Sequence, residues 1–386
     1  MNTFRLVILS PLLCLSGIAA QAATIQPIGC GNADVQKAVD AAANGDTVRL
    51  PASCVTTWDG AVSLPGSKGL TLDGNGGSIA RGGLGSGSTL ISISPSSTTT
   101  TRVTGFSFSD SKQSVGYFIV VGNGSESSAK FRIDHNNFMG IDVLTHIRIA
   151  APVYGVIDHN SFTWSTNNEV IHNEAYGAAS TAGWANDVVP GSGDALYIED
   201  NTFTNRTSGN PAYFWGGSAV QGYYGARTVF RYNKVEMATV DMHGTPGMVG
   251  ARWWEIYENS WYVVPNGDLD KAIGMRGGSG VIFNNHKTGR IDYKADIVLY
   301  EEDDGYPATY QIGRGKNQSS DPAYVWGNDS SMFVGSGSSN VQPGRDYILT
   351  TKPGYKPYTY PHPLVNGVAD SPAPAVLPVP TGLRLL

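Results

Sequence analysis

The sequence predicts an all-β protein: a single-stranded right-handed parallel β-helix with a short N-terminal capping helix. Apolar residues, an Asn and then usually a large apolar residue two positions later form a pattern that recurs along the chain. The Asn positions are Asn136, Asn160, Asn201, Asn233, Asn259 and Asn285. Recurrence on this scale indicates a solenoid, in which each coil buries its apolar face against its neighbours. Apolar and polar residues alternate within the repeats, which indicates half-buried strands.

The N-terminal segment is typical of a secretory signal peptide. Arg5 provides a positive start, residues 6–18 are apolar, and Ala20-Gln21-Ala22 is a small-residue cleavage site. The apolar run is too short to span a bilayer, and no later run is longer. We therefore expect a secreted or periplasmic protein without membrane insertion. Residues 1–22 would be the signal peptide, 23–364 the β-helix domain, and 365–386 a Pro-rich tail extended along the solenoid.

A helix is predicted over residues 32–44. Its apolar stripe consists of Val35, Ala38, Val39 and Ala42, spaced as on one face of a helix. Asn32 is a candidate N-cap, and Asn44-Gly45 would end the helix before a strand at residues 46–50. The first coil of a solenoid otherwise exposes an apolar face and unpaired backbone, so we expect this helix to cover it.

Cys30 and Cys54 are the two cysteines that follow the signal peptide. An even number in an oxidising compartment predicts one disulfide, which would tie the capping helix to the first coil. Two free buried thiols are the alternative.

The composition favours strands and turns, with 48 Gly, 19 Tyr and 8 Trp. Charged residues make up 15% of the chain and the net charge is −6. No basic stripe for nucleic acid and no polybasic membrane patch are present. An acidic polymer could still bind where the few cations converge. No association motif appears, so a monomer is expected.

Residues 32–53 (NADVQKAVDAAANGDTVRLPAS) and 69–79 (GLTLDGNGGSI) have the form of an N-terminal cap and a first full coil. Residues 311–317, 322–328 and 354–364 have the form of closing segments. Together they resemble the secreted bacterial right-handed β-helix proteins of the pectate-lyase-like superfold. The resemblance covers nearly the whole mature chain and implies the fold. It carries no catalytic motif, because the Arg-x-Pro-x-x-Arg motif of pectate lyases and the Gly-His-Gly and Arg-Ile-Lys motifs of polygalacturonases are absent.

The recurring Asn is predicted to be structural. Stacked Asn side chains at a β-helix turn bond to each other and to the backbone, and Asn tolerates left-handed backbone angles. Ile157-Asp158-His159 resembles a stretch near the calcium site of pectate lyases. The same triplet occurs one coil earlier, at Ile133-Asp134-His135, which favours a repeat consensus.

A second set of strands is predicted after the Asn repeats, at residues 145–150, 169–175, 212–217, 239–244 and 272–277. Equivalent positions on neighbouring coils lie about 4.8 Å apart. The outward positions would align Arg148, His172, Tyr213 or Trp215, Asp241 with His243, and Arg276. Met242 would point inward. A titratable ribbon of this kind predicts a functional site.

The ribbon suits cleavage of a uronate-containing glycan by β-elimination. Arg276, supported by Arg252, would neutralise the uronate carboxylate. His243, oriented by Asp241, would be the base, and His172 or Tyr213 the acid. Substrate-binding candidates are Arg148, Arg252, Trp215, Trp184 and Tyr176, although such aromatic rings also pack loops onto coils.

Two other functions remain open. A glycoside hydrolase of the same fold needs two carboxyl groups, and Asp241 with Glu174 or Glu255 could supply them. A non-catalytic carbohydrate-binding or adhesion solenoid would use the aromatic residues alone. No cofactor is required by the sequence. Residues 301–304 (EEDD) could hold Ca²⁺, but they match no defined calcium loop and a solvated turn is the default.

Overall fold

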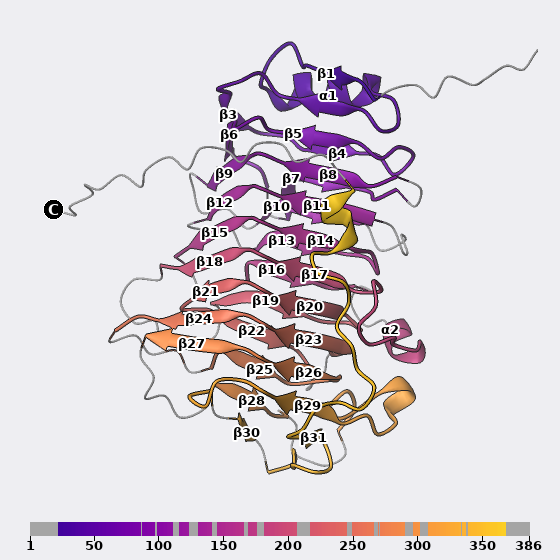
Figure 1. Ribbon diagram of the computed structural model, residues 1–386. Helices are drawn as coiled ribbons and strands as arrows, with labels where there is room; N and C mark the ends of the chain where they lie inside the picture. The colour runs from indigo at the N-terminus through magenta and orange to yellow at the C-terminus, as the bar shows by residue number, and fades with distance from the viewer. Residues whose placement is uncertain are drawn as a thin grey trace, which may run out of the picture.

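The protein is described by a computed structural model over residues 22–85, 87–96, 99–110, 116–122, 130–140, 145–165, 169–175, 181–206, 217–244, 249–265, 269, 271–289, 296–301, 308–332, 334–336 and 339–367. It is the predicted right-handed parallel β-helix, with about nine turns (Figure 1). Each complete coil contributes one strand to each of three parallel sheets. The signal peptide prediction and residues 368–386 of the predicted tail lie outside the described residues.

Sheet 1 contains the strands that precede each Asn. Its strands, in spatial order, are β1 (Thr24–Ile25), β2 (Thr47–Arg49), β5 (Thr71–Asp73), β8 (Thr101–Thr104), β11 (Lys130–Asp134), β14 (Tyr154–Asp158), β17 (Leu196–Glu199), β20 (Arg227–Arg231), β23 (Trp253–Tyr257), β26 (Ser279–Phe283), β29 (Ala323–Trp326) and β31 (Tyr347–Ile348).

Sheet 2 follows directly after each Asn turn. Its strands are β3 (Val55–Trp58), β6 (Ser78–Arg81), β9 (Ser107–Asp110), β12 (Asn137–Gly140), β15 (Ser161–Trp164), β18 (Thr202–Asn205), β21 (Lys234–Glu236), β24 (Ser260–Val263) and β27 (His286–Gly289).

Sheet 3 carries the second predicted set of strands. They are β4 (Val62–Leu64), β7 (Ser88–Ile93), β10 (Gly116–Val121), β13 (Thr145–Ile149), β16 (Ile171–Asn173), β19 (Ser218–Gly222), β22 (Thr239–Met242), β25 (Ile273–Met275), β28 (Ile297–Leu299) and β30 (Val334–Ser336). The strand predicted at residues 212–217 is β19 instead. Residues 212–216 lie outside the described residues.

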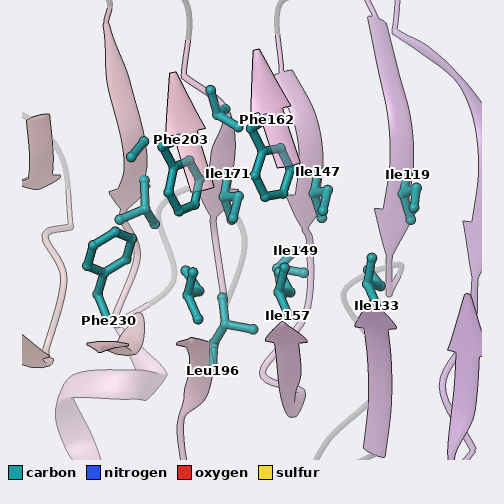
Figure 2. Packing of buried hydrophobic residues seen from close by; sticks show 14 of the residues in the cluster. Ile119, Ile133, Ile147, Ile149, Ile157, Phe162, Ile171, Leu196, Phe203 and Phe230 are labelled. Atoms are coloured by element: carbon teal, nitrogen blue, oxygen red, sulfur yellow. The ribbon is translucent and has the colours of Figure 1, made fainter. Parts of the chain in front are cut away.

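The interior is a set of apolar columns that run along the solenoid axis. Phe138, Phe162 and Phe203 stack with successive ring centroids 4.8 Å apart. Ile119, Ile147 and Ile171 form a parallel column in sheet 3 (Figure 2). Parallel pairing places identical positions of neighbouring coils in contact, so one repeated apolar residue builds a continuous core.

The predicted Asn ladder is present. The Asn201 side chain donates to the carbonyl groups of Ile157 and Glu199, at 2.8 and 2.9 Å, and its Oδ1 accepts from the backbone N–H of Asn160. Asn328 extends the ladder beyond Asn285. The left-handed conformation falls on the preceding residue and not on the Asn. These residues, with φ between 52° and 57°, are His135, His159, Asp200, Tyr232, Glu258 and Asn284.

The capping helix is α1 (Asn32–Ala41), and it buries Val35, Ala38 and Val39 against the first coil. It is shorter than predicted. Asn32 is its first residue, whereas Gly31 occupies the N-cap without a side-chain bond. The predicted disulfide joins Cys30 and Cys54, with Cα atoms 5.8 Å apart.

Residues 352–367, here called the strap, run back along the outer face of sheet 1 and end in α3 (Pro363–Asn366) beside β14 (Figure 1). The strap covers a buried polar layer. Arg231 donates to the carbonyl groups of Tyr358 and Thr359, and Arg132 donates to that of Val365. The part of the chain that lies along the solenoid therefore begins before the predicted tail.

Candidate active site

The candidate site lies on the outer face of sheet 3. Strand register places His172 opposite Gln221 and Gln221 opposite Asp241, so these side chains form one outward column. Gly274 continues this column on the next coil. Gln221 therefore takes the position for which Tyr213 or Trp215 was expected. Tyr213 and Trp215 themselves lie outside the described residues, as does Tyr176.

A second column follows where each strand of sheet 3 ends. Backbone N–H groups of Glu174, Tyr223, His243, Arg276 and Tyr300 each bond to the carbonyl of the preceding coil. Side chains two positions apart on a strand share one face, so both columns point outward together. Met242, between Asp241 and His243, is fully buried in the core as expected.

The two columns line a cavity of about 210 Å³. Its lining residues are Glu169, Ser218, Gln221, Tyr223, Thr239, Asp241, His243, Lys271, Arg276 and Tyr300. The structure thus brings the predicted Asp241, His243 and Arg276 together. His172 lies beside them, with its ring centroid 4.5 Å from that of Tyr223.

Charge in the cavity is organised by an ion pair. Arg276 donates through Nε and Nη2 to the two carboxylate oxygens of Asp241, at 3.1 and 3.0 Å. His243 contacts Arg276, and its Nε2 lies 2.8 Å from the side-chain oxygen of Gln221. Asp241 was expected to orient His243. In the structure Gln221 and Arg276 hold the imidazole, because Arg276 is aligned with His243 and reaches back to Asp241.

Tyr223 is enclosed between two imidazoles. Its ring stacks on that of His243 at a centroid distance of 4.0 Å, and His172 packs on the other side. The phenol oxygen contacts Gln221 and lies 3.3 Å from Oε1 of Glu169. The hydroxyl therefore has a fixed direction in the cavity.

Burial sets the protonation of these groups. Loss of water and the charge of Arg276 lower the pKa of His243 to about 2. Burial lowers the pKa of His172 to about 4. Burial raises the pKa of Glu169 to about 7, aided by the negative charges of Asp241 and Glu174. At neutral pH both imidazoles are neutral, and Glu169 is divided between its two forms.

Lys271 enters the cavity because the next position in the column is a glycine. A Cβ at Gly274 would lie 2.4 Å from Cε of Lys271, so the lysine stem lies across this backbone. The ammonium reaches the hydroxyl of Tyr300 at 3.0 Å. It places a second cation in the cavity beside Arg276.

The other predicted binding residues lie apart from this cavity. Arg148, one coil away from His172, pairs with Glu174. Trp184, in α2 (Ala182–Ala185), and Arg252 pack together with 5.5 Å between the guanidinium carbon and the ring, and Arg252 contacts Asp321. Arg252 directly precedes β23, so this pair lies where the chain enters sheet 1.

Glu255, considered as a hydrolase carboxylate, is on sheet 1 and not beside Asp241. It accepts from the backbone of Gly191, the indole of Trp253 and the hydroxyl of Tyr355 in the strap. A buried carboxylate with three donors is a structural group in this position.

Five lining residues that matter for the site were not predicted as catalytic residues: Glu169, Gln221, Tyr223, Lys271 and Tyr300. Tyr223 was expected only as one of the loop aromatics that could stack on a sugar. A signal for three of them exists in the sequence. Four aligned strands of sheet 3 carry an Ile or Val at the same position of the coil, namely Val220, Val240, Ile273 and Ile297. The third residue after this Ile or Val is Tyr223, His243, Arg276 or Tyr300. The first residue after Val220 is Gln221.

No candidate metal centre emerges from the described ranges, where no three His, Cys, Asp or Glu side chains are grouped to hold an ion. Of the acidic run, only Glu301 is described, and it accepts a bond from Asn340. Residues 302–304 lie outside those ranges. Among the described helices, none combines the length and apolarity needed to cross a membrane.

No protein-family model matches this sequence, and no curated protein is significantly similar to it. Function is therefore argued from the cavity itself.

Proposed function

We propose that this protein is a secreted polysaccharide lyase that cleaves a uronate-containing glycan by β-elimination. The observation that carries the proposal is the convergence of His243, Tyr223, Arg276 and Lys271 in one cavity on the outer face of sheet 3. Elimination requires a cation for the uronate carboxylate, a base for the C5 proton and an acid for the departing O4. These four side chains can supply all three.

Carboxylate recognition is assigned to Lys271 with Arg276. Arg276 donates to Asp241, and the ammonium of Lys271 lies 3.0 Å from the hydroxyl of Tyr300 in the same cavity. A substrate carboxylate between the two cations would gain charge-assisted hydrogen bonds in a buried setting. Arg252, 3% exposed and tied to Asp321, is not needed for this step.

The base is assigned to His243. The pKa of His243 is lowered to about 2 by burial and by Arg276, so the imidazole is unprotonated across the whole neutral range. Its Nε2 is engaged by Gln221 and Arg276, so the other ring nitrogen, Nδ1, would take the C5 proton. Such a low pKa alone would make a weak base. A bound carboxylate offsets the charge of Arg276, which raises the pKa of His243 when substrate is present.

The acid is assigned to Tyr223, in place of Tyr213 or His172. Burial raises the pKa of its phenol well above the usual value, so it carries a proton throughout the neutral range. The C5 proton moves to His243, the C5–H electron pair forms the C4–C5 double bond, the C4–O4 bond breaks, and the Tyr223 proton goes to O4.

The resemblance to the pectate-lyase-like superfold supports the substrate class by analogy alone. We take the partner to be an acidic polysaccharide and the protein to act as a monomer outside the cytoplasm, without nucleic acid or membrane insertion.

A glycoside hydrolase is the second candidate, and one observation favours it. Glu169, whose pKa is raised to about 7, and the carboxylate of Asp241 line the same cavity. A protonated and an ionised carboxyl group are the pair that glycoside hydrolysis uses.

The test is to incubate the mature protein with polygalacturonate, alginate and polyglucuronate. Ultraviolet absorbance of the unsaturated product, rising with new reducing ends, would support elimination. New reducing ends without that absorbance would replace it with hydrolysis. Retention on the polymers with neither signal would favour the adhesion solenoid. His243→Gln and Tyr223→Phe should each lower kcat by about 10² to 10⁴-fold.

A further inference from the structure

We infer that Glu169 is the proton source behind Tyr223: as the phenol protonates the departing oxygen, the Glu169 carboxyl protonates the phenolate. The inference rests on the proposed elimination. Glu169 acts through Tyr223, so it is a positioning and relay residue.

Glu169 lies close to both Tyr223 and His172, the two described residues that were considered as the general acid. Its Oε1 lies 3.3 Å from the Tyr223 hydroxyl, and its Oε2 lies 3.3 Å from Nδ1 of His172. Tyr223 cannot turn away, because its ring is held between the two imidazoles. The Gln221 amide, which donates to Ser218 at 3.1 Å, contacts the same hydroxyl.

The exposed fractions of the side chains show which member of the relay can exchange protons with water. The Tyr223 residue is 5% exposed and the His172 side chain 17%, whereas the Glu169 side chain is 27% exposed. The carboxyl group is therefore the member of this chain best placed to exchange protons with water. It takes up a proton from solvent after each turnover, and His243 releases the C5 proton to solvent, so protons balance.

The charged and titratable groups facing Glu169 are Tyr223, His172, Glu174, Asp241 and Arg276. The nearby carboxylates and burial favour its neutral form, while Tyr223 and Arg276 favour its charged form, with a resulting pKa of about 7. Both imidazoles titrate far lower, at about 2 and about 4. His243 acts in its unprotonated form, so its titration makes kcat rise with pH, whereas a fall of kcat as pH rises past about 7 requires a group that acts in its protonated form and is assigned to Glu169.

The test is the pH profile of kcat for wild type and Glu169→Gln, on whichever of the three uronate polymers is cleaved. Wild-type kcat should fall about tenfold per pH unit above its midpoint near 7. Glu169→Gln keeps the hydrogen-bonding shape but has no proton to give. It should lower kcat below pH 7 and abolish the alkaline fall. Glu174→Gln, which changes a neighbouring carboxylate paired with Arg148, should keep the fall but move its midpoint to lower pH, because the charge of Glu174 helps to raise the pKa of Glu169.

A Glu169→Gln enzyme with lower kcat but an unchanged alkaline fall would overturn the relay while leaving the elimination intact. Wild type that cleaves none of the polymers would overturn the proposed function first. If Glu169→Gln does not fold, Glu169→Asp decides. Its side chain is one methylene shorter, which moves the carboxyl group away from Tyr223, so kcat should drop below pH 7, and an unchanged kcat in that range would refute the relay.

Discussion

Arg276 donates hydrogen bonds to both carboxylate oxygens of Asp241 on the neighbouring coil, and the two side chains are only 6% and 12% exposed. The pair fixes the direction of the guanidinium that also contacts His243. The electrostatics of the cavity therefore depend on a bond between sequence positions 35 residues apart.

Asp241→Asn should destabilise the protein by about 3 to 5 kcal/mol, because it removes the negative charge that the buried Arg276 guanidinium faces at 3.0 Å. The free energy of unfolding in urea at neutral pH measures the loss. Arg206→Gln is the control. It breaks the Arg206–Glu236 pair, whose arginine is 59% exposed, and should cost less than about 1 kcal/mol. Equal losses in the two variants would contradict a special role for the buried pair.

Interior rungs of the Asn ladder should matter more than its end. Asn201→Ala removes the partners of two carbonyl groups and of the Asn160 N–H, all buried, and should cost about 3 kcal/mol. Asn328→Ala, at a part-buried rung where water can replace the amide, should cost about 1 kcal/mol. Thermal and urea unfolding would measure both, and a larger loss at Asn328 would refute the argument.

The fold was predictable because each coil carries an Asn at the same place in its sequence pattern, and these Asn residues stack on one another in the structure. Two positions after each Asn there is usually an inward side chain such as Phe162 or Phe203, so the repeated pattern marks which positions of neighbouring coils lie side by side. The disulfide followed from two cysteines and an inferred oxidising compartment. Local sequence patterns were enough to predict the structure wherever equivalent positions of neighbouring coils pack against each other.

The cavity was only partly predictable. His243 and Arg276 stood out as titratable residues after similar strands, but loop length between coils varies, and the apolar stretch at residues 212–217 resembled a strand more than Ser218–Gly222 does. That shift concealed Gln221 and Tyr223. The strap was equally hidden, because its contacts with Arg132 and Arg231 span more than a hundred residues and leave no local pattern.

Acid should loosen the strap through His362. Its Nδ1 accepts the Leu364 N–H at the start of α3, and burial lowers its pKa from 6.5 to about 4. A histidine whose folded pKa is depressed contributes stability that is complete above pH 6.5 and lost as pH falls toward 4. The shift corresponds to about 3 kcal/mol at most.

His362→Asn should retain a cap, because an amide oxygen also accepts at an N-cap, but should remove this titration. The difference in unfolding free energy between wild type and variant, measured in urea from neutral pH down to about 4, should shrink or reverse as pH falls. Parallel curves for wild type and His362→Asn would exclude His362 as the acid-sensitive group.

Gly274→Ala tests carboxylate recognition without removing any charge. The new methyl group would lie 2.4 Å from Cε of Lys271, so the lysine must leave its place across this backbone. We expect KM for the cleaved uronate polymer to rise about tenfold, equivalent to about 1.4 kcal/mol, with a smaller change in kcat. Lys271→Gln should raise KM in the same way, and methyl-esterified polymer should respond less to either change.

Gly83→Ala, where a Cβ meets open space, is the matched control. If Gly274→Ala leaves KM unchanged while Lys271→Gln raises it, the ammonium acts from another position. If neither variant changes KM, recognition of the carboxylate belongs to Arg276 alone.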